Sequence, residues 1–235
     1  IDGSKTYISN GKNLGIAASL NKAVSVAKDQ GFKWILTMDQ DSFFEEKQIK
    51  HYLAYFEAHF NSSKEVAIVC PEIEPNLSRP EPNDDYHAII RAITSGSLVN
   101  VDICVNLKGF DEKLFIDEVD FEYCYRCVIN GYKIFQFKNI HLTHHLGTRK
   151  KAGYISFLKR SERVLHSPLR VYYMVRNYFY LSAKYAKASP DEFKYKRIQL
   201  FVTLKNNLLF SGQFFKVFAS IIKGYLHFKL NKFSK

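Results

Sequence analysis

The stretch that most constrains the fold is Trp34–Ser42, a short apolar run that ends in two carboxylates one residue apart. A run of this length behind the turn residue Gly31 is typical of a buried strand. Because side chains alternate along a strand, we expect Asp39 and Asp41 to point the same way at its end. Two such carboxylates repel each other unless a hard divalent cation such as Mg²⁺ or Mn²⁺ lies between them, and that cation would bring a diphosphate. A solvated acidic turn is the alternative interpretation, since this pattern is common.

The neighbouring segments predict alternating helices and strands. Helical periodicity covers residues 16–30 and 45–61, and short apolar runs at 66–70 and 88–99 are typical of further strands. This order favours an α/β fold with a parallel sheet, in which ligands bind beyond the carboxyl ends of the strands. The kink at Ser95-Gly96-Ser97 indicates either a bulge or close approach of the backbone to a ligand.

An acidic cluster lies within six positions and consists of Asp117, Glu118, Asp120 and Glu122. In one interpretation, Asp120 caps a helix that runs to about residue 130, with Glu122 in its first turn. In the other, one of these acids is a general base held at the start of a helix in a pocket. The residues alone leave both interpretations open.

The charge is divided unevenly along the chain. Residues 1–147 carry 15 Lys/Arg against 20 Asp/Glu, whereas residues 148–235 carry 19 against 3, a net charge of +16. We therefore expect two regions, a body over 1–147 and a basic, aromatic helical region over 148–235, with helices near 168–181, 190–210 and 213–233. The last of these is either a basic amphipathic helix on an anionic membrane or a helix packed on its own domain.

The four cysteines are scattered, which fits a reducing compartment. Cys124 and Cys127 stand two residues apart, but no second pair or histidine cluster stands at zinc spacing. No signal peptide and no apolar run of membrane-spanning length is visible in the sequence.

Taken together, the motifs resemble in order and spacing those of the family 2 glycosyltransferases, and most closely their bacterial rhamnosyltransferase-like branch. The resemblance spans roughly residues 5–181 and implies a GT-A (Rossmann-like) fold with a mixed, mainly parallel sheet flanked by helices and a C-terminal helical extension. The matching segments are Asn13–Asn21, Asp39–Ser42, Ser95–Ser97, Gly109–Glu122, Gly131–Ile134, His144–Gly147 and Pro168–Asn177.

The resemblance implies a role for each matching position. Asp39 and Asp41 match the D-x-D pair that holds Mg²⁺ or Mn²⁺ on the donor diphosphate, and His144 matches a late metal or diphosphate ligand, with His145 as its competitor. Asp120 matches the catalytic base, although the family usually has Glu where Val119 stands; Asp117, Glu118 and Glu122 are the neighbours that could replace it. The remaining donor contacts are expected at Asn13, Gly15, Asp39, Ser95, Gly96 and Arg149.

The implied activity is an inverting, metal-dependent transfer of a sugar, rhamnose or another deoxyhexose, from a dTDP- or UDP-sugar to a polysaccharide or lipid-linked acceptor. A cytoplasmic location, with peripheral contact at the inner face of the cell membrane through the C-terminal helices, would suit such an acceptor. The family's first strand and base-binding segment are expected ahead of Asn13, so this body would be N-terminally incomplete, and the sequence leaves open whether the chain alone is active.

Two other classes of function compete with this interpretation. A non-catalytic sugar- or membrane-binding protein could keep the fold without the chemistry. A nucleic-acid binder is suggested by the basic aromatic region, but no nucleic-acid motif accompanies that charge, and no nucleic-acid partner is expected.

Overall fold

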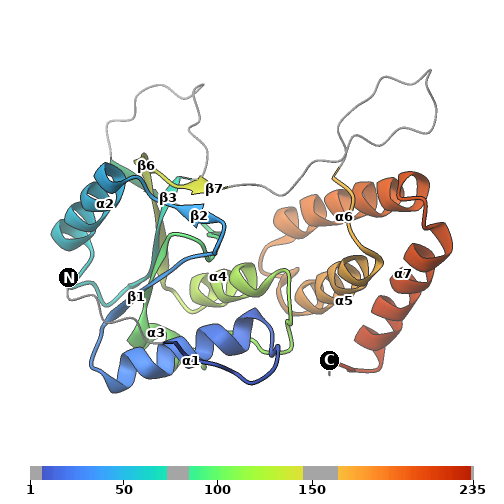
Figure 1. Ribbon diagram of the computed structural model, residues 1–235, viewed down its shortest axis with the longest axis horizontal. Helices are drawn as coiled ribbons and strands as arrows, with labels where there is room; N and C mark the ends of the chain where they lie inside the picture. The colour runs from blue at the N-terminus through green and yellow to red at the C-terminus, as the bar shows by residue number, and fades with distance from the viewer. Residues whose placement is uncertain (1–6, 73–84, 145–163, 234–235) are drawn as a thin grey trace.

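The computed structural model describes residues 7–72, 85–144 and 164–233. Its centre is a five-stranded sheet in the order β1-β5-β3-β6-β4, formed by β1 (Trp34–Thr37), β5 (Ser97–Asn100), β3 (Val66–Glu72), β6 (Lys133–His141) and β4 (Tyr86–Ala88). A separate pair joins β2 (Ser42–Phe43) to β7 (Thr143–His144). Figure 1 shows this sheet with helices on both sides.

The mixed α/β fold is confirmed, but the prediction of a mainly parallel sheet is wrong. In the described part of the chain β3 pairs in parallel with β6, whereas β1–β5, β3–β5 and β4–β6 are antiparallel. The reason is that β5 lies between β1 and β3 and opposes both. The strands β1, β3 and β6 do share a direction, as the sequence pattern predicted. The pattern did not predict that β5 and β4 run in the opposite direction.

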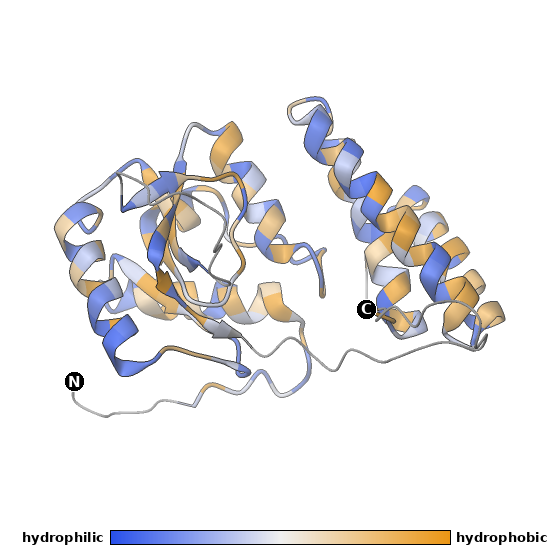
Figure 2. Cartoon of the chain, turned by 90° about the horizontal axis from the view of Figure 1, so that it is seen from above, coloured by the Kyte–Doolittle hydropathy of each residue, from blue (hydrophilic) through white to orange (hydrophobic). Residues whose placement is uncertain are grey.

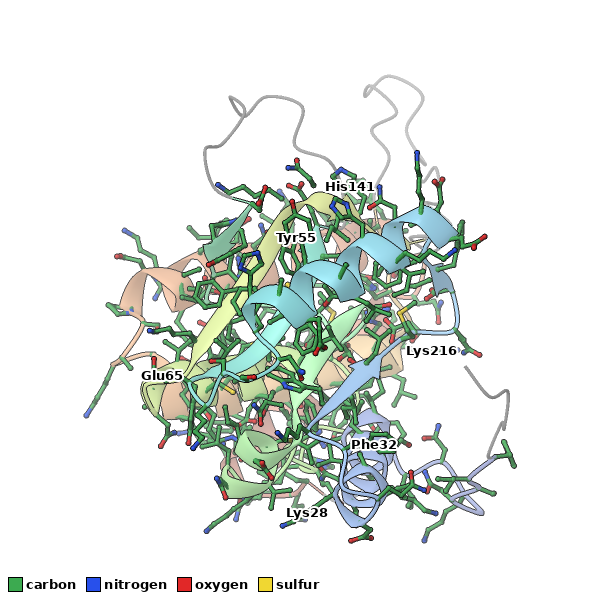
Figure 3. The ribbon with its side chains drawn as sticks, turned by 90° about the vertical axis from the view of Figure 1, so that its left-hand side faces the viewer. Lys28, Phe32, Tyr55, Glu65, His141 and Lys216 are labelled. Carbon is green, nitrogen blue, oxygen red and sulfur yellow. The ribbon has the colours of Figure 1, made fainter. Side chains whose placement is uncertain are left out.

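Two layers of helices cover the sheet. Helix α2 (Glu46–His59) lies over one face, where Tyr52 and Phe56 join Val69, Leu98 and Phe137 in one buried cluster. Figure 3 shows this helix crossing in front of the strands. The main core lies on the other face, under α1 (Ile16–Asp29), α3 (Val101–Asn106) and α4 (Val119–Ile129). Strand β3 is buried over Val66–Pro71 because both faces are covered, which explains its unbroken apolar run.

The C-terminal helices are α5 (Pro168–Tyr185), α6 (Pro190–Phe210) and α7 (Phe214–Lys229), close to their expected positions. Ser167 caps α5 by accepting a hydrogen bond from the amide of Arg170 at 3.3 Å, with Pro168 in the first turn. Leu181, Tyr185 and Phe193 from α5 and α6 are buried in the same cluster as α4. The division at residue 147 stays a prediction. No helix among the described residues has the length and apolarity to cross a membrane.

One expected strand ends earlier than its apolar run, and another is interrupted. Strand β1 stops at Thr37, so Asp39 and Asp41 lie in the following turn, where the strand alternation that predicted their common direction does not apply. The segment 88–99 contains only the end of β4 and the start of β5, with irregular backbone between them. In both places, hydrogen bonds to residues far away in the sequence take the place of hydrogen bonds between paired strands.

Candidate functional site

The end of β1 is fixed by the kink at Ser95-Gly96. The Thr37 carbonyl accepts a 2.8 Å hydrogen bond from the amide of Gly96, and the amide of Asp39 donates to the Ser95 hydroxyl at 3.2 Å. Gly96 has φ of 76°, and a Cβ there would lie 2.9 Å from the Pro71 ring, so a side chain is excluded on both counts. The kink therefore positions Asp39, whereas its predicted contact with a donor stays a prediction.

Asp39 and Asp41 occupy one tight turn, closed by a 3.2 Å hydrogen bond from the amide of Ser42 to the Asp39 carbonyl. The β2–β7 ladder then pairs Ser42 with His144, which brings the backbone of His144 beside this turn. Two carboxylates on a short exposed turn are hard oxygen donors of the kind Mg²⁺ and Mn²⁺ accept, while a diphosphate could supply the remaining oxygens. These residues thus fit the expected ion, although no cluster of three metal-binding side chains is found among the described residues.

A cavity of about 630 Å³ lies between α1 and the end of β1. Of the expected donor contacts, Asn13, Gly15 and Asp39 line it together. The Asn13 side chain accepts a 3.0 Å hydrogen bond from the amide of Gly15, whose φ of 88° suits glycine, and a Cβ at Gly15 would lie 2.6 Å from the Phe115 carbonyl. The structure thus gathers residues 26 positions apart around one space of a size that suits a small-molecule ligand.

A second cavity of about 490 Å³ adjoins the first, and Ile16, Asp39, Thr94 and Ile116 line both. This second cavity is lined by three acidic residues, Asp117, Glu118 and Asp120, and by residues of α5 and α6. The residues contributed by those two helices are Arg170, Met174, Tyr178, Tyr195, Lys196, Gln199, Leu200 and Thr203. The second cavity therefore holds three members of the acidic cluster, and the first holds three of the donor candidates.

The members of the acidic cluster differ in their ionic partners. Asp117 pairs with Arg170 at 2.8 Å and Glu118 with Lys196 at 2.5 Å. Glu122 is fully buried and pairs with Arg126 at 2.7 Å and Lys184 at 2.8 Å. Asp120 has no ion pair with any described residue.

Asp120 lies in the first turn of α4 rather than at its cap, which is Glu118, so the prediction of an Asp120 cap is wrong. Its carboxylate accepts a 2.9 Å hydrogen bond from the amide of Phe121. Burial raises the pKa of Asp120 to about 6, the Phe121 amide opposes this, and the Glu118 carboxylate adds to it. A carboxyl with a pKa near neutrality, facing a cavity, is suited to accept a proton.

The loop before α4 is held by a fully buried pair on α5, Arg176 and Asn177. The Asn177 amide donates to the carbonyls of Ile116 and Asp117 at 2.7 and 3.0 Å, and the Arg176 guanidinium donates to the Lys113 carbonyl at 2.9 Å. Asp117 and Glu118 both have positive φ, which costs on the order of 1 kcal/mol or more for each such residue. Helix α5 thus stabilises a strained loop that leads directly to Asp120.

Sequence reasoning missed the cations of this site. Arg91, Arg170 and Lys196 all line the second cavity, and Arg91 also pairs with Glu192 of α6 at 3.1 Å. Their separation along the chain hides the cluster. The excess of positive charge after residue 147 is the signal that could have found Arg170 and Lys196, but not Arg91. The predicted contacts Arg149 and His145 lie outside the described residues, as does the side chain of His144.

Comparison with known proteins identifies the domain. Residues 2–99 match the family model described as Glycosyl transferase family 2. This match supports a glycosyl transferase family 2 domain over residues 2–99. The resemblance inferred from the motifs is therefore confirmed.

The chain is similar to two named proteins. It is 29% identical over 193 residues to the dTDP-rhamnosyl transferase RfbF of Shigella flexneri, an alignment that covers 74% of this chain and 62% of the relative. It is 25% identical over 183 residues to an uncharacterized glycosyltransferase, MJ1057, of Methanocaldococcus jannaschii, covering 74% and 61%. The chain thus spans about three fifths of the length of these relatives.

Among solved structures, that of TarS 1–349 from S. aureus in complex with UDP-GlcNAc is 14% identical, with a TM-score of 0.42, and covers 93% of this chain and 54% of that one. The structure of TarS 1–349 alone gives 13% identity and a TM-score of 0.40, covering 92% and 53%.

Proposed function

We propose that this chain carries the catalytic part of an inverting glycosyltransferase that moves a deoxyhexose, rhamnose in the first instance, from a dTDP-sugar to an acceptor hydroxyl. The observation that carries the proposal is the setting of Asp120. It is the member of the acidic cluster that lacks an ion pair among the described residues, and it faces a cavity that adjoins the one lined by Asp39. The named rhamnosyl relative supports the choice of sugar and base.

The proposed mechanism uses both cavities. The donor lies in the cavity between α1 and β1, with its diphosphate at the Asp39–Asp41 turn, and the acceptor hydroxyl lies in the cavity beside Asp120. Asp120 takes the hydroxyl proton as that oxygen forms a bond to the anomeric carbon, and the bond from this carbon to the diphosphate oxygen breaks on the opposite face. When bound by Asp39, Asp41 and His144, a divalent ion would neutralise the charge that develops on the diphosphate.

The donor is UDP-based in an alternative version of the proposal, and both versions place the acceptor on a cell-surface polysaccharide or a lipid carrier. We also propose that the reaction takes place in the cytoplasm at the inner face of the cell membrane. The four buried, free cysteines fit that reducing compartment.

Replacing Asp39 and Asp41 together by alanine should remove metal-dependent nucleotide binding. Because the two carboxylates occupy one turn beside the donor cavity, their loss should weaken dTDP affinity in the presence of Mn²⁺ by more than about tenfold. Calorimetric titration of dTDP and UDP, with and without Mn²⁺, measures this, and dTDP should bind the unaltered chain more tightly.

The matched control replaces Asp29 and Asp102, two exposed aspartates on α1 and α3, and should bind as the unaltered chain does. Nucleotide affinity that survives both chelation of the metal and loss of Asp39 and Asp41 would contradict the assignment of this turn.

The pH dependence of transfer should report Asp120. A base works only when deprotonated, so the rate should rise with pH through about 6, the raised pKa of Asp120. Lys196→Gln leaves the Glu118 carboxylate without its 2.5 Å partner and should shift this rise to higher pH. Glu118→Gln removes the neighbouring negative charge and should shift it to lower pH.

The two substitutions combined should largely cancel, which a purely structural effect would not produce. The control is Lys194→Gln, which changes an exposed lysine on α6, the helix that also carries Lys196. Its pH profile should be unchanged. If the pH profiles of the unaltered protein, the two single variants and the double variant had the same midpoint, a group other than Asp120 would control the rate.

A further inference from the structure

Helix α7 is held in one orientation by its inner face. Val217 is fully buried against α5, and a Cβ at Gly224 would lie 2.7 Å from the Tyr172 carbonyl, so the two helices approach closely there. The Tyr172 hydroxyl is 2.9 Å from Nδ1 of His227, and the Phe179 ring lies 4.9 Å from that of Tyr225. The direction in which the remaining side chains of α7 point is therefore fixed.

The outer face of α7 carries an apolar stripe in solvent. Phe215 is 84% exposed, and Phe218, Ile222 and Leu226 are exposed by 44–49%. Their spacing of three, four and four residues places them along one line of the helix. Figure 2 shows the apolar colouring that recurs along the C-terminal helices. Exposed aromatic side chains in such a line are rare on a free surface and indicate a partner that is itself apolar.

The charge around the stripe selects the partner. Helix α7 carries Lys216, Lys223 and Lys229 and no acidic residue, and with the neighbouring α6 the two helices hold seven Lys/Arg against two Asp/Glu. Lys216 and Lys223 are exposed and stand beside the stripe. An anionic lipid surface matches both properties, since it offers an apolar layer beneath negative headgroups. A nucleic acid would match the charge but would give Ile222 and Leu226 no apolar contact.

We propose that the outer face of α7 binds an anionic lipid surface, with Phe215, Phe218 and Ile222 entering the headgroup boundary and Lys216 and Lys223 contacting lipid phosphates. At 16 residues, α7 would lie in the plane of the interface rather than cross it. The outer face of α7 would be the surface through which the enzyme of the proposed function contacts the membrane, so this inference rests on that function. Because lipid binding is measured without donor, acceptor or turnover, it can fail or succeed independently of sugar transfer.

The test is co-sedimentation of the full chain with phosphatidylcholine vesicles, with and without phosphatidylglycerol. We expect binding to the anionic vesicles only, and a decrease of at least about tenfold in the partition constant when Phe215, Phe218 and Ile222 are all replaced by serine. Replacing Lys216 and Lys223 by glutamine should also weaken binding and make it less sensitive to salt.

A matched control replaces Phe32, Leu53 and Ile129, three apolar residues exposed elsewhere by 41–58%, by serine. It should bind vesicles as the unaltered chain does. Unfolding by urea confirms that both triple variants are folded, which is expected because all six side chains are on the surface.

Four outcomes would overturn the proposal. One is absence of binding to anionic vesicles, and another is equal binding by the α7 variant and the unaltered chain. The third is a dimer, measured by light scattering, that the α7 substitutions dissociate while vesicles are not bound, which would show that a second copy of the chain covers the stripe. Salt-sensitive binding to duplex DNA without binding to vesicles would likewise assign the basic face to nucleic acid.

Discussion

Asp120→Asn should reduce sugar transfer by roughly 10²–10⁴-fold, the usual contribution of a general base. Asparagine keeps the shape of the side chain and can still accept the 2.9 Å hydrogen bond from the amide of Phe121, so α4 should begin as before. It cannot take a proton from the acceptor. Because Asp120 faces the second cavity, whereas Asn13 and Gly15 line the first, affinity for dTDP should be unchanged.

The measurement pairs a transfer assay with calorimetric titration of dTDP. Asp102→Asn, an exposed aspartate on α3, is the matched control and should leave both quantities unchanged. Asp117→Asn and Glu118→Gln remove acids that already have cationic partners, so each should retain far more activity than Asp120→Asn. Full activity in the Asp120 variant, together with a large loss in either neighbour, would move the base to that neighbour.

The sequence predicted the helices well because their signals are local. Helix α1 begins and ends within one residue of the expected range of 16–30, and α2 lies within 45–61. Both have apolar residues at helical spacing, and α1 is followed by a glycine turn. Periodicity needs no information about distant parts of the chain, so tertiary structure had little to change there.

The sheet was less predictable because its pairing depends on distant segments. The apolar run from Trp34 continues to Met38, yet β1 ends at Thr37, whose hydroxyl donates to the carbonyls of Thr94 and Ser97. These contacts span some 60 residues of sequence, and no local pattern reports them. The direction of β5, which is antiparallel to both β1 and β3, likewise depends on segments that are distant in the sequence.

At the candidate site, the resemblance supplied residues and the structure supplied their environment. The motifs pointed to Asp39 and Asp120, but among four nearby acids only the ionic partners distinguish Asp120 from the rest. Except for Arg126 of α4, those partners come from α5 and α6 in the basic region. Part of the positive charge that we assigned to an external partner is therefore used inside the molecule, at Arg170, Lys184 and Lys196, and the remainder is available at the surface.

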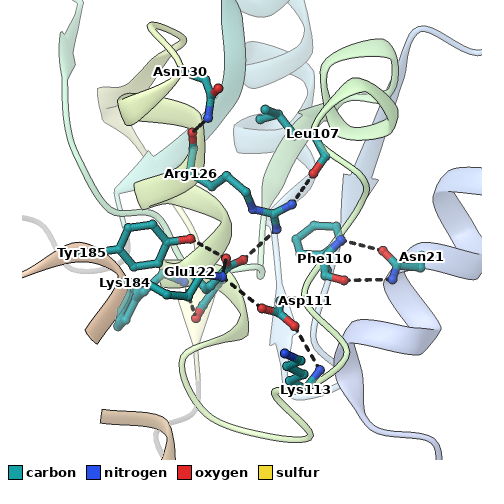
Figure 4. A network of polar contacts seen from close by, with 12 residues as sticks. Asn21, Leu107, Phe110, Asp111, Lys113, Glu122, Arg126, Asn130, Lys184 and Tyr185 are labelled. Carbon is teal, nitrogen blue, oxygen red and sulfur yellow. Dashed lines mark hydrogen bonds and ion pairs between the residues drawn. The ribbon is translucent and has the colours of Figure 1, made fainter. Parts of the chain in front are cut away.

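Glu122 should prove to be the acid on which stability depends. Its carboxylate is fully buried and accepts hydrogen bonds from the Tyr185 hydroxyl at 2.6 Å, from Lys184 at 2.8 Å and from Arg126 at 2.7 Å (Figure 4). Glu122→Ala would leave two cations and a hydroxyl without their common partner between α4 and α5. Loss of one member of a buried ionic group typically costs about 3–5 kcal/mol, and we expect a decrease of that size in the free energy of unfolding.

Urea unfolding, followed by circular dichroism, measures this free energy. Glu46→Ala is the control. Glu46 is 82% exposed and pairs with Lys50, which is exposed as well, so its removal should change the free energy of unfolding by no more than about 0.5 kcal/mol.

The same residue also separates a structural role from a catalytic one. Glu122→Gln keeps the shape of the side chain, so enough folded protein should remain for an assay at low temperature. With Asp120 intact, this folded variant should retain most of its transfer rate, because the partners of Glu122 on α5, Lys184 and Tyr185, do not line the cavity beside Asp120. A folded Glu122→Gln protein that has lost transfer as completely as Asp120→Asn would show that the proton passes to Glu122 instead.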